Sequence, residues 1–105
     1  MSVYVTMQVT TDPAAFEKAA VEHADAIGRI METAKSKGLI GHRWFRGEDA
    51  VMAVDEWPTA GDFQAFMGEA EAAIGPFMAA AGVTSPPAVT VWGHVDIDDV
   101  FGWGA

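Results

Sequence analysis

Residues 41–57 read GHRWFRGEDAVMAVDEW, and the predicted fold is built around this segment. Two apolar runs flank the short polar segment Gly47-Glu48-Asp49, which predicts a β-hairpin with strands over 39–46 and 51–57. Most side chains that could carry chemistry lie on or beside this hairpin: His42, Arg43, Trp44, Glu56 and Trp57. The rest of the sequence is therefore interpreted by how it would pack against the hairpin.

The segments before and after the hairpin predict two more strands. Residues 3–10 alternate between apolar and polar side chains, with Val3, Val5, Met7 and Val9 on one face. Residues 88–95 alternate in the same way. Each pattern is typical of a strand that buries one face.

Two helices are predicted between these strands. The first covers 13–36, since Asp12 or Thr11 can cap it and Pro13 suits its first turn. Its apolar stripe is Phe16, Ala20, His23, Ile27, Ile30 and Ala34. The second begins after the capping residue Thr59, and we expect Gly68 and the Gly75-Pro76 pair to kink it or divide it in two.

The predicted element order, β-α-β-β-α-β, is that of an α+β ferredoxin-like fold. Such a fold has a four-stranded antiparallel sheet with both helices on one face. Residues 1–105 are expected to form this single domain. The other face carries large and aromatic groups and also needs a cover, so we predict a symmetric homodimer in which sheet packs on sheet.

Charge and composition exclude several classes of partner. The formal charge is −9, and all six lysines and arginines lie within the first 46 residues. Nucleic acid and anionic membranes both require clustered cations, so neither is an expected partner. No cysteine is present, which removes disulfides, thiolate nucleophiles and cysteine-based zinc sites. No signal peptide and no bilayer-spanning run is found, which favours the cytoplasm.

The candidate site depends on the register of the hairpin. If the turn is centred on Glu48, then His42, Trp44 and Glu56 share one face, with Glu56 diagonal to His42. A slip of one residue would bring Asp55 and Trp57 to that face instead. If the face points toward the helices, His23 points into the same space from the first helix.

Two imidazoles and a carboxylate in an apolar cleft suit acid/base catalysis, because a low dielectric and mutual charge separate their pKa values. They are also the donor set of a two-histidine-one-carboxylate metal site. The alternative is a set of separate polar groups, each hydrogen-bonded where it packs. We predict His23, His42 and Glu56 as catalytic residues, with no metal and no cofactor. Trp44, Trp57 and Phe66 are predicted to form the ligand-binding wall.

The segment VDEWP at 54–58, followed by TAGDFQAF at 59–66, resembles the strand-to-helix segment of the antibiotic biosynthesis monooxygenase-like proteins. These proteins are dimeric α/β barrels. They include cofactor-independent quinone-forming monooxygenases, haem-degrading enzymes, lactone isomerases and many members of no known activity. The resemblance implies an oxygenase-like or isomerase-like enzyme acting on a small hydrophobic or aromatic metabolite. The competing hypothesis is a dimeric ligand-binding or scaffold protein without catalysis.

The sequence departs from the residues that this family uses. Its monooxygenases place an asparagine, a tryptophan, a tyrosine and an arginine around a polycyclic phenol. This chain has no asparagine, and its one tyrosine is Tyr4 on the first strand. Haem-degrading members have a histidine on the second helix, and residues 59–81 contain none. The resemblance therefore argues against haem degradation and carries over a single tryptophan, Trp57.

The last stretch, DIDDVFGWGA at 96–105, is acidic and holds two large aromatic residues, Phe101 and Trp103. Exposed rings of this size are expected to dock either on the same chain or on a partner chain.

Overall fold

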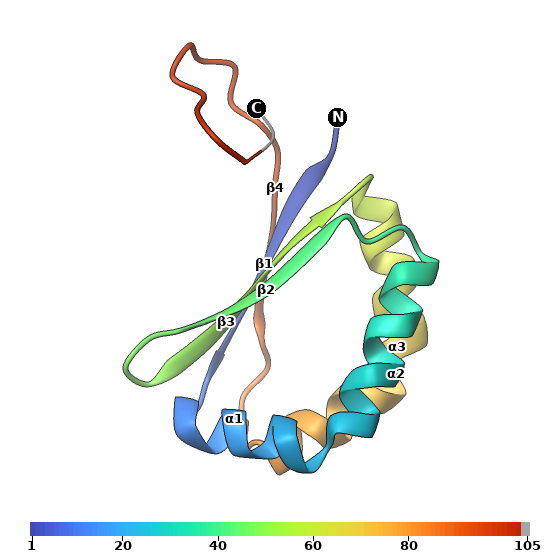
Figure 1. Cartoon of the computed structure of the whole chain (residues 1–105), viewed down its shortest axis with the longest axis vertical. Helices are drawn as coiled ribbons and strands as arrows, with labels where there is room; N and C mark the ends of the chain where they lie inside the picture. The colour runs from blue at the N-terminus through green and yellow to red at the C-terminus, as the bar shows by residue number, and fades with distance from the viewer. Residues whose placement is uncertain (104–105) are drawn as a thin grey trace.

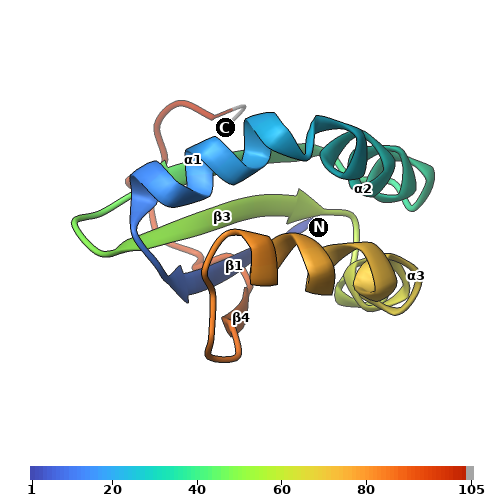
Figure 2. The same ribbon diagram turned by 90° about the horizontal axis from the view of Figure 1, so that it is seen from below.

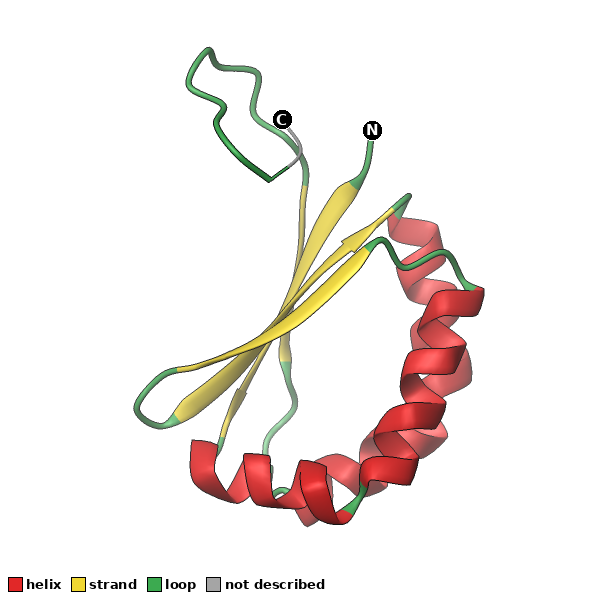
Figure 3. Ribbon diagram, viewed as in Figure 1, coloured by secondary structure: helices red, strands yellow, loops and turns green. Residues whose placement is uncertain are grey.

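The computed structural model describes residues 1–103 and confirms the predicted ferredoxin-like α+β fold. Gly104 and Ala105, at the end of the acidic tail, lie outside the described residues. Figures 1 and 3 show the sheet, with its helices on one side. In chain order the elements are β1 (Val3–Thr10), α1 (Pro13–Glu22), α2 (Ala24–Ser36), β2 (Gly41–Arg46), β3 (Ala50–Trp57), α3 (Ala60–Ala80) and β4 (Ala88–Trp92).

The four strands form one antiparallel sheet in the order β2-β3-β1-β4. Side chains alternate across it as the sequence pattern predicts, and Val5, Val9, Val51, Ala53 and Trp57 are buried under the helices. The opposite face, which we call the open face, carries Tyr4, Thr6 and Gln8 of β1 and the residues that pair with them. No helix of residues 1–103 lies on the open face (Figure 1).

The first predicted helix is two helices. The helix expected over 13–36 breaks at His23, whose backbone angles are φ −113° and ψ 36°. The break lets α1 cross one end of the sheet while α2 runs along its side (Figure 2). The start was predicted correctly, because Asp12 caps α1 by accepting from the Ala14 amide and Pro13 is the first helical residue.

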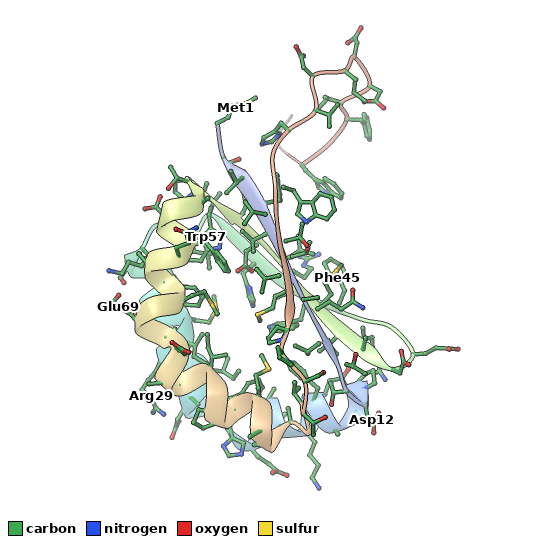
Figure 4. The ribbon with its side chains drawn as sticks, turned by 180° about the vertical axis from the view of Figure 1, so that it is seen from behind. Met1, Asp12, Arg29, Phe45, Trp57 and Glu69 are labelled. Atoms are coloured by element: carbon green, nitrogen blue, oxygen red, sulfur yellow. The ribbon has the colours of Figure 1, made fainter. Side chains whose placement is uncertain are left out.

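The second helix is continuous from Ala60 to Ala80 and includes Pro76. Of the two alternatives expected for this segment, division into two helices is wrong; α3 changes direction along its length, which agrees with the expected kink (Figure 4). Its start follows the sequence, since the Thr59 hydroxyl accepts from the Asp62 amide at 3.1 Å.

The core is divided into two clusters of buried side chains. One lies at the hairpin-turn end of the sheet and contains Val9, Phe16, Ala19, Val51, Phe77, Met78 and Ala81. The other lies at the opposite end and contains Val5, Ala34, Trp57, Phe63, Phe66 and Ala70. Ile74 of α3 packs against both. The space where the two clusters meet holds the candidate site.

Within residues 1–103, no helix has both the length and the hydrophobicity that crossing a membrane requires. The cytoplasmic location stays a prediction.

Candidate functional site

The hairpin register brings His42 and Asp55 together. β2 and β3 pair so that His42 lies directly opposite Asp55 and Trp44 opposite Ala53. His42 Nδ1 and Asp55 Oδ1 are 2.6 Å apart. Although the His42 backbone lies on an edge strand, its side chain is only 23% exposed, and that of Asp55 is 12% exposed. A short contact of this kind, largely shielded from water, is a strong charge-assisted hydrogen bond.

Trp57 fixes the other oxygen of Asp55. Its indole Nε1–H donates to Asp55 Oδ2 at 3.3 Å, and the tryptophan is completely buried. An indole can only donate, so Oδ2 must act as an acceptor. An ionised Asp55 then accepts from both neighbours, with the proton of a neutral His42 on Nδ1. This arrangement leaves His42 Nε2 as the ring's proton acceptor.

The His42–Asp55 pair lies in the wall of an apolar cavity with a volume of about 70 Å³. A single water molecule needs only about 10–15 Å³ on the same measure, so the cavity holds more than one small group. His42 and Asp55 are its only polar lining residues in the described chain, and no lysine or arginine contributes. The apolar lining is Met7, Ile27, Ile30, Met31, Ala34, Leu39, Trp44, Ala53, Phe63, Phe66, Met67, Ile74, Phe77 and Met78.

Aromatic rings determine the shape around the pair. Trp44 lies edge-on to His42, with ring centroids 6.0 Å apart, and packs on Phe16 at 4.8 Å. On the other side Trp57 packs on Phe66 at 5.2 Å. Trp44 and Phe66 line the cavity, whereas Trp57 lies behind Asp55 and is not a lining residue. The expectation that Trp57 walls the pocket is therefore wrong, and its indole supports Asp55 instead.

Glu56 does not join His42. The predicted register paired His42 with Val54, but the strands pair one residue further on, which turns Glu56 to the open face. There it accepts a hydrogen bond from the Ser2 hydroxyl at 2.6 Å and lies opposite Tyr4. The reason is the turn: the Gly47 amide donates to the Ala50 carbonyl at 2.8 Å, so the loop is the two-residue Glu48-Asp49 rather than one centred on Glu48.

His23 does not join the site either. It lies at the break between α1 and α2, is exposed, and is absent from the cavity lining. The predicted stripe required one uninterrupted helix, and the break changes the helical phase at this residue. Of the three predicted catalytic side chains, only His42 therefore lies at the site. Its partner there is Asp55, which the main prediction did not include.

The sequence predicts Asp55 at the site only in the alternative hairpin register, which is shifted by one residue. The signal that favours it is the turn length, because two-residue loops are the commonest hairpin connections. Within residues 1–103, no group of three histidine, cysteine, aspartate or glutamate side chains could hold a metal ion. The two-histidine-one-carboxylate alternative is not formed, because His23 and Glu56 lie away from His42.

Solved structures with the same fold cover nearly the whole chain. A Bordetella bronchiseptica protein, named as a candidate antibiotic biosynthesis monooxygenase, is 19% identical with a TM-score of 0.64, over 90% of this chain and 97% of its own. SnoaB, a cofactor-independent oxygenase from Streptomyces nogalater, is 13% identical with a TM-score of 0.59, over 94% and 97%. A further antibiotic biosynthesis monooxygenase is 12% identical with a TM-score of 0.65, over 89% and 98%.

The chain has the fold of these proteins. No family model matches the sequence, and no curated protein matches it. At such identities the likeness establishes the architecture alone, which agrees with the fold that the segment at 54–66 implied.

Removing the indole donor tests the support of Asp55. Trp57→Phe leaves a buried carboxylate oxygen without its partner, so we expect a loss of about 1–3 kcal/mol in the free energy of unfolding, measured with urea. Trp92→Phe is the matched control, with every variant measured at a protein concentration low enough to keep the chain monomeric, because in a single copy the Trp92 indole donates to Thr6 at an exposed site. We expect the control to lose less than about 0.5 kcal/mol. Equal losses in the two variants would contradict the support of Asp55 by Trp57.

The position of Glu56 on the open face can be tested through the pKa of its neighbour Tyr4. Desolvation raises the pKa of the Tyr4 hydroxyl above its ordinary value, and the charge of the hydrogen-bonded Glu56 carboxylate raises it further. Because Tyr4 is the only tyrosine, ultraviolet absorbance follows it alone. Glu56→Gln should lower the pKa of Tyr4, whereas Glu48→Gln at the distant turn should leave it unchanged.

The sign of the accompanying stability change follows from the raised pKa. The folded state disfavours the phenolate form of Tyr4. The contribution of Tyr4 to the free energy of unfolding is therefore fully present below a pH of about 10, and it is lost as the pH rises through the pKa of Tyr4 in the folded protein. An unchanged Tyr4 titration in Glu56→Gln would contradict the placement of Glu56.

Proposed function

We propose that the chain is a small oxygenase-like or isomerase-like enzyme in which His42 removes a proton from a hydrophobic ligand held in the cavity. The observation that carries this proposal is the 2.6 Å contact between His42 and Asp55 in the wall of an otherwise apolar cavity. A solvated surface pair would have neither the apolar surroundings nor the buried indole donor behind it.

Each residue of the chain Trp57–Asp55–His42 has a distinct role in the proposed proton transfer. Trp57 orients the carboxylate, and Asp55 holds the imidazole with its proton on Nδ1, so that Nε2 accepts the proton of the ligand. The resulting imidazolium is then stabilised by the adjacent Asp55 charge. Because the cavity lining is apolar, this electrostatic stabilisation is stronger than the same pair would provide in water.

The cavity favours a neutral ligand. No cationic side chain of the described residues lines it, so an anionic group would be buried beside Asp55 without compensation. Phe66 and Trp44 offer flat apolar surfaces, and four methionines offer adaptable ones. A small hydrophobic or aromatic compound with one acidic C–H or O–H group fits these properties best.

The fate of the deprotonated ligand separates the two versions of the proposal. In the oxygenase version the carbanion forms a C–O bond to dioxygen, and the resulting peroxide takes up the proton held by His42. The same carbon then loses its second hydrogen as the O–O bond breaks, which leaves a carbonyl on the ligand and releases the outer oxygen as water. In the isomerase version His42 returns the proton at another position, and no dioxygen is consumed. SnoaB, which has this fold, is a cofactor-independent oxygenase, and this supports the first version.

We further propose that the functional unit is a homodimer in which two open faces pack together. Phe45 of β2 is 49% exposed on the open face, and Trp92 of β4 is 53% exposed there. Exposed aromatic groups on an uncovered sheet face are typical of an interface. A two-fold pair covers both sheets with the same contacts.

A generic proton-transfer probe tests the base directly. Nitrobenzisoxazole is a neutral bicyclic compound; when a base removes its ring C–H proton, the N–O bond breaks to give a nitrile and a coloured phenolate. We expect the wild-type protein to accelerate this opening and His42→Ala to reduce the rate by about 10²–10⁴-fold. His94→Ala, on the open-face side, is the matched control and should retain the wild-type rate.

The same assay distinguishes the competing hypothesis of a ligand-binding or scaffold protein. If His42 is structural, His42→Ala lowers the melting temperature without lowering the rate. If the wild-type protein binds nitrobenzisoxazole but does not accelerate its opening, the cavity binds without catalysis and the enzymatic proposal is wrong. Circular dichroism of each variant confirms that a lost rate is not a lost fold.

A further inference from the structure

The cavity beside His42 is elongated along the helices that cover it. Its lining on α3 begins at Phe63 and ends at Met78, two residues that lie about 22 Å apart along a straight helix. The bend in α3 (Figure 4) and the reach of the two side chains toward each other shorten this span, but about 10 Å remains. The lining on α2, from Ile27 to Ala34, also covers about 10 Å. Both helices thus indicate a long cavity.

The same cavity is narrow. Its volume of about 70 Å³ corresponds to about five to seven water-sized positions, since one water molecule needs about 10–15 Å³ on this measure. A compact cluster of these positions would be too short to touch both Phe63 and Met78. The positions must therefore follow one another in a narrow row. An unbranched hydrocarbon chain has this shape, whereas a fused ring system is broad as well as long.

Ile74 of α3 lies at the middle of this row. It lines the cavity and packs against both core clusters, at the level where they meet. Its β-branched side chain has few rotamers, so it cannot easily turn aside for a broad ligand. Met7 and Met78 line the cavity on the hairpin-turn side of Ile74, and their flexible side chains can adapt to a chain that passes them. Ile74 therefore forms a waist in the cavity.

The hairpin register determines which end of the cavity is polar. Asp55 pairs with Val5, which belongs to the buried cluster at the end of the sheet opposite the hairpin turn. His42 and Asp55 therefore lie toward that end. From them an apolar lining continues past Ile74 to Phe77, which is 3% exposed and belongs to the other cluster. A ligand with its polar group at His42 would extend its apolar part toward Phe77.

We propose that the ligand of this site carries an unbranched alkyl chain, which runs from a polar group at His42 past Ile74 to the closed end at Phe77. This inference relies on the proposed function for the position of the reacting group, and it adds the chemical class of the apolar part. Each methylene that enters the narrow cavity leaves water and contacts apolar atoms on all sides, so affinity should rise with chain length until the chain reaches Phe77. Ile74 is the specificity-determining residue, because it admits a chain and excludes fused rings.

Linear methyl ketones test the proposal, because they combine a neutral polar group with a C–H bond that a base can break. The full-length protein is labelled with ¹³C on its methionine methyl groups and titrated with methyl hexyl ketone. We expect saturable shifts of Met7 and Met78, which line the cavity, and an unchanged signal from Met52, which pairs with Gln8 on the open face. From methyl ethyl ketone upward, Kd should fall about fourfold with each added methylene and then level off.

A matched ketone with fused rings tests the shape requirement. Acetylnaphthalene has the same methyl ketone group and more carbon atoms than methyl hexyl ketone, but its rings are broad. We expect it to bind about tenfold more weakly than methyl hexyl ketone, because its rings cannot pass Ile74 without overpacking the cavity.

Two variants change the proposed selection in different ways. Ile74→Ala removes the waist, so acetylnaphthalene should bind about tenfold more tightly than to the wild-type protein. Phe77→Leu leaves space at the closed end, so Kd should level off at a longer ketone than in the wild-type protein. Ala72→Leu, on the exposed face of α3, is the matched control and should alter neither preference. Circular dichroism verifies each fold, and the milder Phe77→Leu keeps the test decisive if Ile74→Ala does not fold.

Three outcomes would overturn the proposal. Acetylnaphthalene that binds as tightly as methyl hexyl ketone shows that the cavity does not select a chain. A Kd that does not depend on chain length, or a larger shift at Met67 than at Met78, shows that no chain lies between Ile74 and Phe77. A shift at Met52 as large as that at Met78 shows that the ketones bind outside the cavity.

The failure of this proposal and the failure of the proposed function give different results. The nitrobenzisoxazole assay requires only the His42 end of the cavity, whereas the methionine shifts report binding without any reaction. Chain binding with no proton transfer supports the chain site and contradicts the enzymatic proposal. Proton transfer with no chain binding supports His42 as the base and refutes the alkyl chain.

Discussion

The structure depends on the pairing of His42 with Asp55 across the β2–β3 hairpin. Because side chains alternate along a strand, this one register decides which residues of β2 lie under the helices and which lie on the open face. It places His42 and Trp44 at the cavity, and Arg43 and Phe45 on the opposite surface. The candidate site and the side chains of β2 on the open face are therefore two consequences of the same backbone alignment.

The division of the core into two clusters leaves a cavity beside the His42–Asp55 pair. If the two buried clusters merged, the His42–Asp55 pair would be enclosed in packed side chains without room for a ligand. The cavity between them instead presents one hydrogen-bonded imidazole to a space lined by carbon and sulfur. The buried Trp57 indole stabilises Asp55 in this position, since a carboxylate at this depth needs a donor for each oxygen.

The sequence predicted the elements well and the site only in part, for identifiable physical reasons. Alternation in β1 and the caps at Asp12 and Thr59 are local signals, and the structure confirms them. The register of β3 is not a local signal, because Val51 and Ala53 on one face are as apolar as Met52 and Val54 on the other. Pattern alone could not choose between Asp55 and Glu56. The helix break at His23 has no proline or glycine to mark it, so the apolar spacing predicts a single helix that continues through this residue.

The tautomer of His42 is the most direct measure of the central claim that Asp55 orients this imidazole. Two-bond ¹H–¹⁵N spectra of uniformly ¹⁵N-labelled protein distinguish the two ring nitrogens of each of the three histidines, with His23 and His94 as internal references. The account predicts that neutral His42 carries its proton on Nδ1 and that Asp55→Asn abolishes this preference. A neutral His42 protonated mainly on Nε2 in the wild-type protein would contradict it.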